Sequence, residues 1–103
     1  MTYRRALLME MMVADLREVI RAQGLSGGRT KADLVNRLIN KDVVLSEAQA
    51  RYIEALRLEA YELKIPVCVS MRDISSKRAA TAWITDVKEK CNAVKSRRTD
   101  HPA

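Results

Sequence analysis

Apolar residues recur every three or four positions along most of the chain, which is the spacing that places them on one face of an α-helix. The first such stripe consists of Leu8, Met12, Leu16, Val19 and Ile20. It ends at Gly24, which is expected to supply the left-handed residue after a helix, with Leu25 folding back onto the last turn. The pattern fits one long helix over residues 3–23, and it equally fits a shorter helix that breaks near Met11.

Two more helices are indicated by their starting residues. Capping boxes, in which a hydroxyl side chain and a polar side chain three positions later satisfy free backbone N–H groups, can form from Thr30 with Asp33 and from Ser46 with Gln49. They predict helices from Lys31 to about Asn40 and from Glu47 to about Lys64. Ile65-Pro66 ends the later helix, because the residue before a proline avoids the helical conformation.

The last third of the chain is predicted to hold an extended connector and one further helix. Val67 and Val69 alternate with other residues over 66–73, which is typical of extended backbone. The helix begins at Ser75 or Ser76. The residues predicted to face the core in the later helices are Leu34, Val35, Leu38, Ile39, Tyr52, Ile53, Leu56, Ala60, Leu63, Ala80, Trp83, Ile84, Val87, Cys91 and Val94.

The charge of the chain favours an anionic partner. Its 103 residues include 19 Lys and Arg against 13 Asp and Glu. The excess of positive charge lies in residues 1–40 and 75–103, whereas residues 41–74 are slightly acidic. A small basic protein of this kind is suited to nucleic acid or to an anionic membrane surface. Either polyanion is expected to meet the ends of the chain rather than its middle.

Several other classes of protein are not expected. No apolar run reaches the roughly 20 residues that span a bilayer, and acidic residues interrupt the apolar N-terminal segment, so neither a membrane span nor a signal peptide is predicted. Cys68, Cys91 and His101 do not have the spacing of zinc ligands, so both cysteines are expected to be buried free thiols in a reducing, intracellular compartment, cytoplasmic or nucleoid or nuclear. No constellation of catalytic residues and no cofactor motif is present, so a non-enzymatic protein without cofactor is predicted.

The glycine-rich turn before the second capped helix is the strongest candidate site. Gly27, Gly28, Arg29 and Lys31 stand beside a helix N-terminus, where free N–H groups and the helix dipole favour an anion. Arg37 follows two turns later on the same helix. Such an arrangement can hold a phosphate backbone without reading bases. We therefore predict DNA binding through these five residues, with weak sequence selectivity.

The same segment resembles the SAP motif, a short helix-turn-helix module of many chromatin, RNA-processing and DNA-repair proteins. The resemblance covers residues 12–39 and rests on Met12-Val13, Leu16, Val19-Ile20, Gly24-Leu25, Ser26-Gly27-Gly28, Lys31, Leu34, Arg37 and Leu38. Arg29 stands where the family usually has a glycine, and Met12 stands where the family usually has a hydroxyl helix cap. The resemblance implies a helix-turn-helix fold and binding of double-stranded DNA, with RNA as the alternative.

The expected architecture is therefore all-α: a SAP-like helix-turn-helix followed by a second helical hairpin, together forming one compact domain. Residues 1–41 would form the SAP-like module with an N-terminal helical extension, residues 42–95 the hairpin, and residues 96–103 a disordered basic tail. The hairpin weakly resembles those of small phage and bacterial proteins. A homodimer is one way in which the core could be completed.

The N-terminal segment is also compatible with a different function, the binding of a protein partner. Met9, Met11 and Met12 stand close together in the N-terminal helix. Methionine side chains are flexible and polarizable and suit adaptable protein-binding surfaces. The alternative hypothesis is a phage- or plasmid-encoded adaptor that docks on a protein partner through these methionines, which would then be partly exposed.

Overall fold

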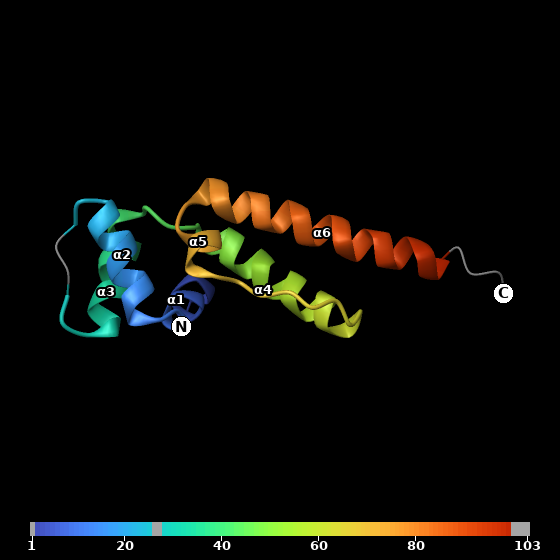
Figure 1. Cartoon of the computed structure of the whole chain (residues 1–103), viewed down its shortest axis with the longest axis horizontal. Coiled ribbons are helices and arrows are strands. Elements are labelled where there is room, and N and C mark those ends of the chain that lie inside the picture. The colour runs from blue at the N-terminus through green and yellow to red at the C-terminus, as the bar shows by residue number, and fades with distance from the viewer. Residues whose placement is uncertain (1, 26–27, 100–103) are drawn as a thin grey trace.

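The computed structural model describes residues 2–25 and 28–99, with side chains to residue 97. Every regular element in these ranges is a helix, so the fold is all-α, as the sequence predicted. The helices are α1 (Tyr3–Met9), α2 (Val13–Ala22), α3 (Lys31–Lys41), α4 (Glu47–Glu62), α5 (Met71–Ile74) and α6 (Lys77–Thr99) (Figure 1).

Two helical pairs lie at opposite ends of an elongated molecule (Figure 1). α2 packs against α3, α4 packs against α6, and the short α5 packs on α6. α1 lies between the pairs and contacts both α3 and α4. The molecule measures 59 × 22 × 21 Å, and one hydrophobic core continues through both pairs. The two helical pairs are therefore joined by buried side chains and not by a linker alone.

The N-terminal helix is broken, which settles the alternative that the sequence left open. α1 ends with tight hydrogen bonds from Glu10 N to Leu7 O (3.2 Å) and from Met11 N to Leu8 O (3.1 Å), and Met12 is extended. The break turns Met11 into the core, where it is 8% exposed, and leaves Met12 70% exposed. Met12, which the sequence placed on the apolar stripe, therefore lies outside the core, because the stripe assumed that the helical register continued through this position.

The same break changes the methionine surface that the adaptor hypothesis required. Met9 is partly buried against the core and Met11 is buried, so only Met12 offers a largely exposed side chain. The expectation that Met11 would be exposed is wrong.

Local capping signals were confirmed at three helix ends. Gly24 has a φ of 70°, and the N–H groups of Gly24 and Leu25 donate to Arg21 O and Ile20 O, both at 3.0 Å. These bonds satisfy the last carbonyl groups of α2 in the manner of a Schellman motif. Capping boxes are present at Thr30 with Asp33 and at Ser46 with Gln49. The start of α6 is settled as well, because Ser76 Oγ accepts a hydrogen bond from Ala79 N.

The connector between α4 and α6 is shorter than predicted. Residues 65–70 form no regular element and alternate between half-buried and exposed, but a capped helical turn, α5, replaces the end of the predicted extended segment. The alternation turns Val67 and Val69 inward and leaves Cys68 exposed, so the prediction that Cys68 is buried was wrong, whereas Cys91 is buried. The Cys68 carbonyl still accepts a hydrogen bond from Nε1 of Trp83 at 3.0 Å, and this tryptophan lies in the core as predicted.

Two further details differ from the pattern. Tyr52, predicted to face the core, is 43% exposed and lies near the Lys88 ammonium, 6.0 Å from the ring centre. α6 continues to Thr99, so residues 96–99, expected in the disordered tail, are helical. Lysine and arginine have high helix propensity, and Lys95 forms an ion pair with Glu59 of α4, which together account for the longer helix.

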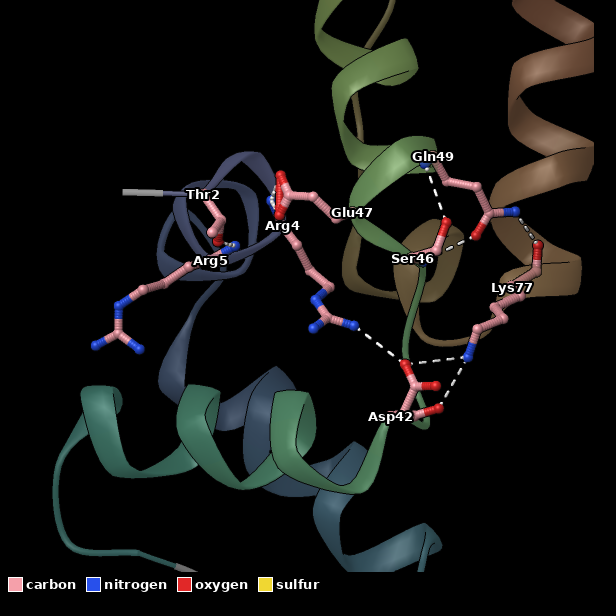
Figure 2. Close-up of polar contacts among 8 residues, drawn as sticks. All are labelled: Thr2, Arg4, Arg5, Asp42, Ser46, Glu47, Gln49 and Lys77. Carbon is pink, nitrogen blue, oxygen red and sulfur yellow. Dashed lines mark hydrogen bonds and ion pairs between the residues drawn. The ribbon is translucent and has the colours of Figure 1, made fainter.

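Polar contacts close the joint between the two helical pairs (Figure 2). The Glu47 carboxylate, from the first turn of α4, accepts hydrogen bonds from the backbone N–H groups of Tyr3 (2.6 Å) and Arg4 (3.2 Å). It therefore caps the N-terminus of α1 from another helix. Thr2 accepts from the next free group, Arg5 N, at 3.2 Å. Three orphan donors of the short α1 are satisfied in this way.

Asp42 is the second element of the joint. It follows α3 in the left-handed conformation, and its carboxylate pairs with Arg4 of α1 (3.1 Å) and Lys77 of α6 (3.2 Å) (Figure 2). The hydrogen bond and charge of Lys77, followed by those of Arg4, lower the pKa of Asp42 below its usual 3.8. Lys77 also donates to the Asp42 carbonyl at 2.9 Å. α1, α3 and α6 thus converge on one residue.

Candidate functional site

Gly28 lies in the turn between α2 and α3, at a position where any side chain would require the surrounding atoms to shift. A Cβ atom at Gly28 would lie 2.3 Å from the Cβ of Asp33 and 3.2 Å from its backbone carbonyl carbon. The chain therefore passes directly against the first turn of α3 before it reaches Arg29. Gly27, which the sequence also predicted as a site residue, lies outside the described residues.

The N-terminus of α3 is capped by its own side chains. Thr30 Oγ1 accepts from Asp33 N (3.2 Å), and Asp33 Oδ2 accepts from Thr30 N (3.3 Å). The Asp33 carboxylate thus supplies the negative charge that a helix N-terminus favours. A second anion at this point would be repelled by Asp33. Any anion bound near the turn must consequently be held mainly by side chains and not by the free N–H groups of α3.

Three arginines line one shallow pocket beside the turn. Arg17 and Arg21 come from α2 and Arg29 from the turn, and all three are exposed. We call this the arginine pocket; its remaining lining residues are Ile20, Leu25 and Gly28. No acidic side chain lines it among the described residues. The Schellman turn at Gly24 explains the arrangement, because it folds the chain back over the end of α2.

A second shallow pocket adjoins the first and shares Gly28 and Arg29 with it. We call it the α3 pocket; it is further lined by Asp33, Asn36, Arg37, Asn40 and Lys41. It adds two cations to the site, but Asp33 offsets part of their charge. Arg37 forms no ion pair with Asp33 in the described part of the chain, although four positions separate them. The arginine pocket is therefore the more strongly positive of the two.

The predicted residues fall into three groups. Gly28, Arg29 and Arg37 are brought together at the two pockets. Lys31 is half-buried and lines neither pocket. It stands three, four and seven positions before buried Leu34, Val35 and Leu38, so it lies near the core-facing side of α3. Gly27 cannot be placed.

Sequence reasoning missed Arg17, Arg21 and Lys41. Arg17 and Arg21 are four positions apart, so their side chains are neighbours on α2. That spacing is visible in the sequence, but the proximity of Arg29 to them depends on how the chain folds back. The spacing of two arginines on the polar side of α2 was thus the available signal.

The five cations of the two pockets have no direct carboxylate partner in the described part of the chain. No ion pair is formed there by Arg17, Arg21, Arg29, Arg37 or Lys41. Like charges four positions apart on a helix repel each other, at a cost of roughly 0.2–0.5 kcal/mol per pair. A bound anion would relieve this repulsion between Arg17 and Arg21.

The acidic residues of α2 line a separate pocket and do not line the arginine pocket. Asp15 and Glu18 line a different pocket, together with Val19, Ala22 and Met71 of α5. Arg72 of α5 lines the same pocket, so a cation from another helix accompanies the two carboxylates there. Neither Asp15 nor Glu18 lines the arginine pocket, although Glu18 stands only three positions before Arg21 on α2.

No protein-family model, no curated protein and no solved structure matches this chain. Within residues 2–25 and 28–99, no helix is both long and apolar enough to cross a membrane. The same ranges hold no group of three or more His, Cys, Asp or Glu residues placed to bind a metal ion. The geometry of the turn is therefore the main evidence on function.

Proposed function

We propose that this protein binds nucleic acid without catalysis, through the phosphates of double-stranded DNA. The observation that carries the proposal is the convergence of Arg17, Arg21 and Arg29 on one pocket that no described acidic side chain lines. Arg37 and Lys41 extend the positive surface along α3. Guanidinium groups form paired, charge-assisted hydrogen bonds with phosphate oxygens, which makes arginine well suited to this task. The resemblance of residues 12–39 to the SAP motif points to the same class of ligand.

Contacts to the backbone, rather than to bases, fit the composition of the two pockets. Neither is lined by an aromatic side chain, so neither offers the stacking surface that single-strand binders use. Asn36, which could read an adenine edge, already accepts a hydrogen bond from Arg5 of α1. We therefore propose weak sequence selectivity and a preference for duplex over single-stranded DNA, with duplex RNA as the competing ligand.

The phosphate contacts proposed here differ from those that the sequence predicted. The capping box and the Asp33 carboxylate occupy the N-terminus of α3, and Lys31 lies near the core side of that helix. Arg17 and Arg21 replace Lys31 and the helix amides as the main proposed contacts beside Arg29. The adaptor function has less support, because only Met12 of its three methionines is largely exposed.

The test is a comparison of two double charge reversals in binding to a fluorescent DNA duplex, measured by anisotropy over a series of salt concentrations. The site variant is Arg21→Glu with Arg29→Glu. The control is Arg51→Glu with Arg78→Glu, which changes the net charge equally at exposed cations of α4 and α6. We expect the site variant to lose affinity by tenfold or more, equivalent to about 1.4 kcal/mol, and the control to lose much less.

The salt dependence gives a second measure. Each lost phosphate contact lowers the slope of log affinity against log salt by roughly 0.9 on duplex DNA, so the site variant should lower it by up to about 1.8. Equal losses in both variants would mean diffuse attraction to a basic protein, and would contradict a localised site. No binding by the unmodified chain would refute the proposal. Parallel titrations with duplex RNA and with single strands decide which nucleic acid is preferred.

A further inference from the structure

Large apolar side chains are exposed at the end of the molecule that lies away from α2 and α3. Leu58 and Tyr61 of α4 are 61% and 80% exposed. Two adjoining shallow pockets surround Tyr61, and Ile65 and Pro66 line both of them. We call Leu58, Tyr61, Ile65 and Pro66 the tip surface. Figure 1 shows the end of α4, and the turn that follows it, remote from the α2–α3 pair.

A hydrogen-bonded backbone turn after α4 fixes the positions of the residues in the tip surface. Lys64 adopts the left-handed conformation (φ 61°), and the N–H of Ile65 donates to Ala60 O at 2.8 Å. This Schellman-type turn returns the connector along α4 and places Ile65 and Pro66 beside Tyr61. Leu58, Tyr61 and Ile65 therefore form a continuous apolar surface whose backbone needs no rearrangement before another molecule can pack on it.

The charges around this surface indicate what packs there. Glu62 and Lys64 line the same pocket as Tyr61. Neither forms an ion pair in the part of the chain that the structure describes. Glu54 and Arg57, which line the adjoining pocket, are already paired with each other at 2.7 Å. The tip surface thus carries one free negative and one free positive charge beside its apolar centre.

We propose that the tip surface is a homodimer interface, in which the occupant is a second copy of this chain. A twofold axis brings the same patch of both copies together, so residue i of one copy meets residue j of the other, and the reverse. Glu62 of each copy then pairs with Lys64 of the other, while Leu58 and Tyr61 pack across the axis. A strongly acidic or strongly basic partner would leave one of the two charges unmatched. The self-complementary pair therefore favours a second copy.

The small size of the surface sets the expected strength of the dimer. Stable interfaces bury about 800 Å² on each partner, and the tip surface comprises only a few side chains. We expect a reversible dimer that forms at micromolar concentrations or above. Both arginine pockets would remain free at the far ends of this dimer. The inference is independent of the proposed DNA binding.

The experiment is sedimentation equilibrium of the full chain over a concentration series, without nucleic acid and with reductant to keep the exposed Cys68 reduced. Tyr61→Glu should weaken dimerisation at least tenfold. The matched control is Tyr52→Glu, because Tyr52 lies nine positions earlier on α4 and so points to the opposite side of the helix. Circular dichroism checks that each variant retains its helices.

Charge reversals test the pairing itself. Glu62→Lys and Lys64→Glu should each weaken the dimer, because each places like charges together at two symmetric contacts. The double reversal should restore it. A chain that stays monomeric to near-millimolar concentration would overturn the proposal, and would leave a different protein as the occupant. The proposal would equally be overturned if Tyr61→Glu left the dimer unchanged. It would also be overturned if the double charge reversal did not restore the dimer that each single reversal weakens.

Discussion

Removing the carboxylate of Glu47 should destabilise both helical pairs, and not only α1. This carboxylate accepts hydrogen bonds from Tyr3 N and Arg4 N and lies at the positive end of α1 (Figure 2). Hydrogen bonds to a charged group each contribute about 1.5–3 kcal/mol when buried. Tyr3 is exposed, so water can replace part of the loss there. We therefore expect Glu47→Ala to lower the free energy of unfolding by about 2 kcal/mol, which is less than the roughly 3–6 kcal/mol that two buried bonds of this kind would contribute.

The assay is urea and thermal unfolding followed by two signals. Circular dichroism reports all helices, whereas the fluorescence of Trp83 reports the core between α6 and the connector. A loss of about 2 kcal/mol should lower the melting temperature by roughly 8–16 °C in a domain of this size. Both signals should shift together, because α1 packs against α3 and α4 and one core runs through both pairs. Glu47→Gln, which keeps an acceptor but loses the charge, should fall between the wild type and Glu47→Ala.

The control is Glu89→Ala, which removes an exposed carboxylate of α6 that has no partner among the described residues. It should change stability by no more than about 0.5 kcal/mol. If Glu47→Ala shifts the circular dichroism transition but leaves the Trp83 transition unchanged, then the two pairs unfold independently. Glu47 and Asp42 would then not couple the unfolding of the two pairs. An unchanged stability by both signals would mean that water replaces the carboxylate at no cost.

Three further predictions concern single residues. Gly28→Ala should destabilise the fold by about 1–3 kcal/mol, measured by urea unfolding, because its Cβ would lie 2.3 Å from that of Asp33; an unchanged midpoint would show that the turn moves freely. Asp42→Asn should be less stable than the wild type at neutral pH, and the difference in stability should vanish as the pH falls below 3.8. The reason is that the lowered pKa of Asp42 stabilises the fold only while the carboxylate is ionised. A difference in stability that persists at low pH would contradict this. A thiol reagent should label Cys68 rapidly and Cys91 only on unfolding, and equal rates would refute the burial of Cys91.

The features that the sequence predicted correctly are set by neighbouring residues. A capping box such as Thr30 with Asp33 needs only two side chains three positions apart. The left-handed turn at Gly24 likewise depends on one residue without a side chain. The core positions of α3 follow from helical periodicity within eleven residues. None of these features requires knowledge of where the other helices lie.

The break between α1 and α2 has a different origin. No proline or glycine interrupts residues 3–22, so the sequence offers no local reason for it. In the structure, α1 packs between α3 and α4, and Glu47 caps it from a helix more than 40 positions away. A straight helix over 3–23 would have to give up these contacts. The break is thus determined by tertiary packing, which periodicity does not contain.

The candidate site was only partly predictable, because some of its residues are neighbours in the sequence and others meet only in the folded chain. Gly28, Arg29 and Arg37 belong to one local segment, and the sequence places them together. Arg17 and Arg21 reach the site only because the turn at Gly24 folds the chain back over α2. Their approach to Arg29 is a property of the folded chain.

The distribution of ion pairs adds an argument about the use of charge in this fold. Several cations form ion pairs between different helices. Asp42 pairs with Arg4 of α1 and Lys77 of α6, and Glu10, which follows α1, pairs with Arg57 of α4. Those cations contribute to the net charge of +6 but are engaged in holding the helices together. The arginine pocket differs because three cations line it and no described carboxylate does. Such an arrangement costs stability unless an anion is bound, and the proposed binding of phosphate therefore depends on this local excess rather than on the net charge.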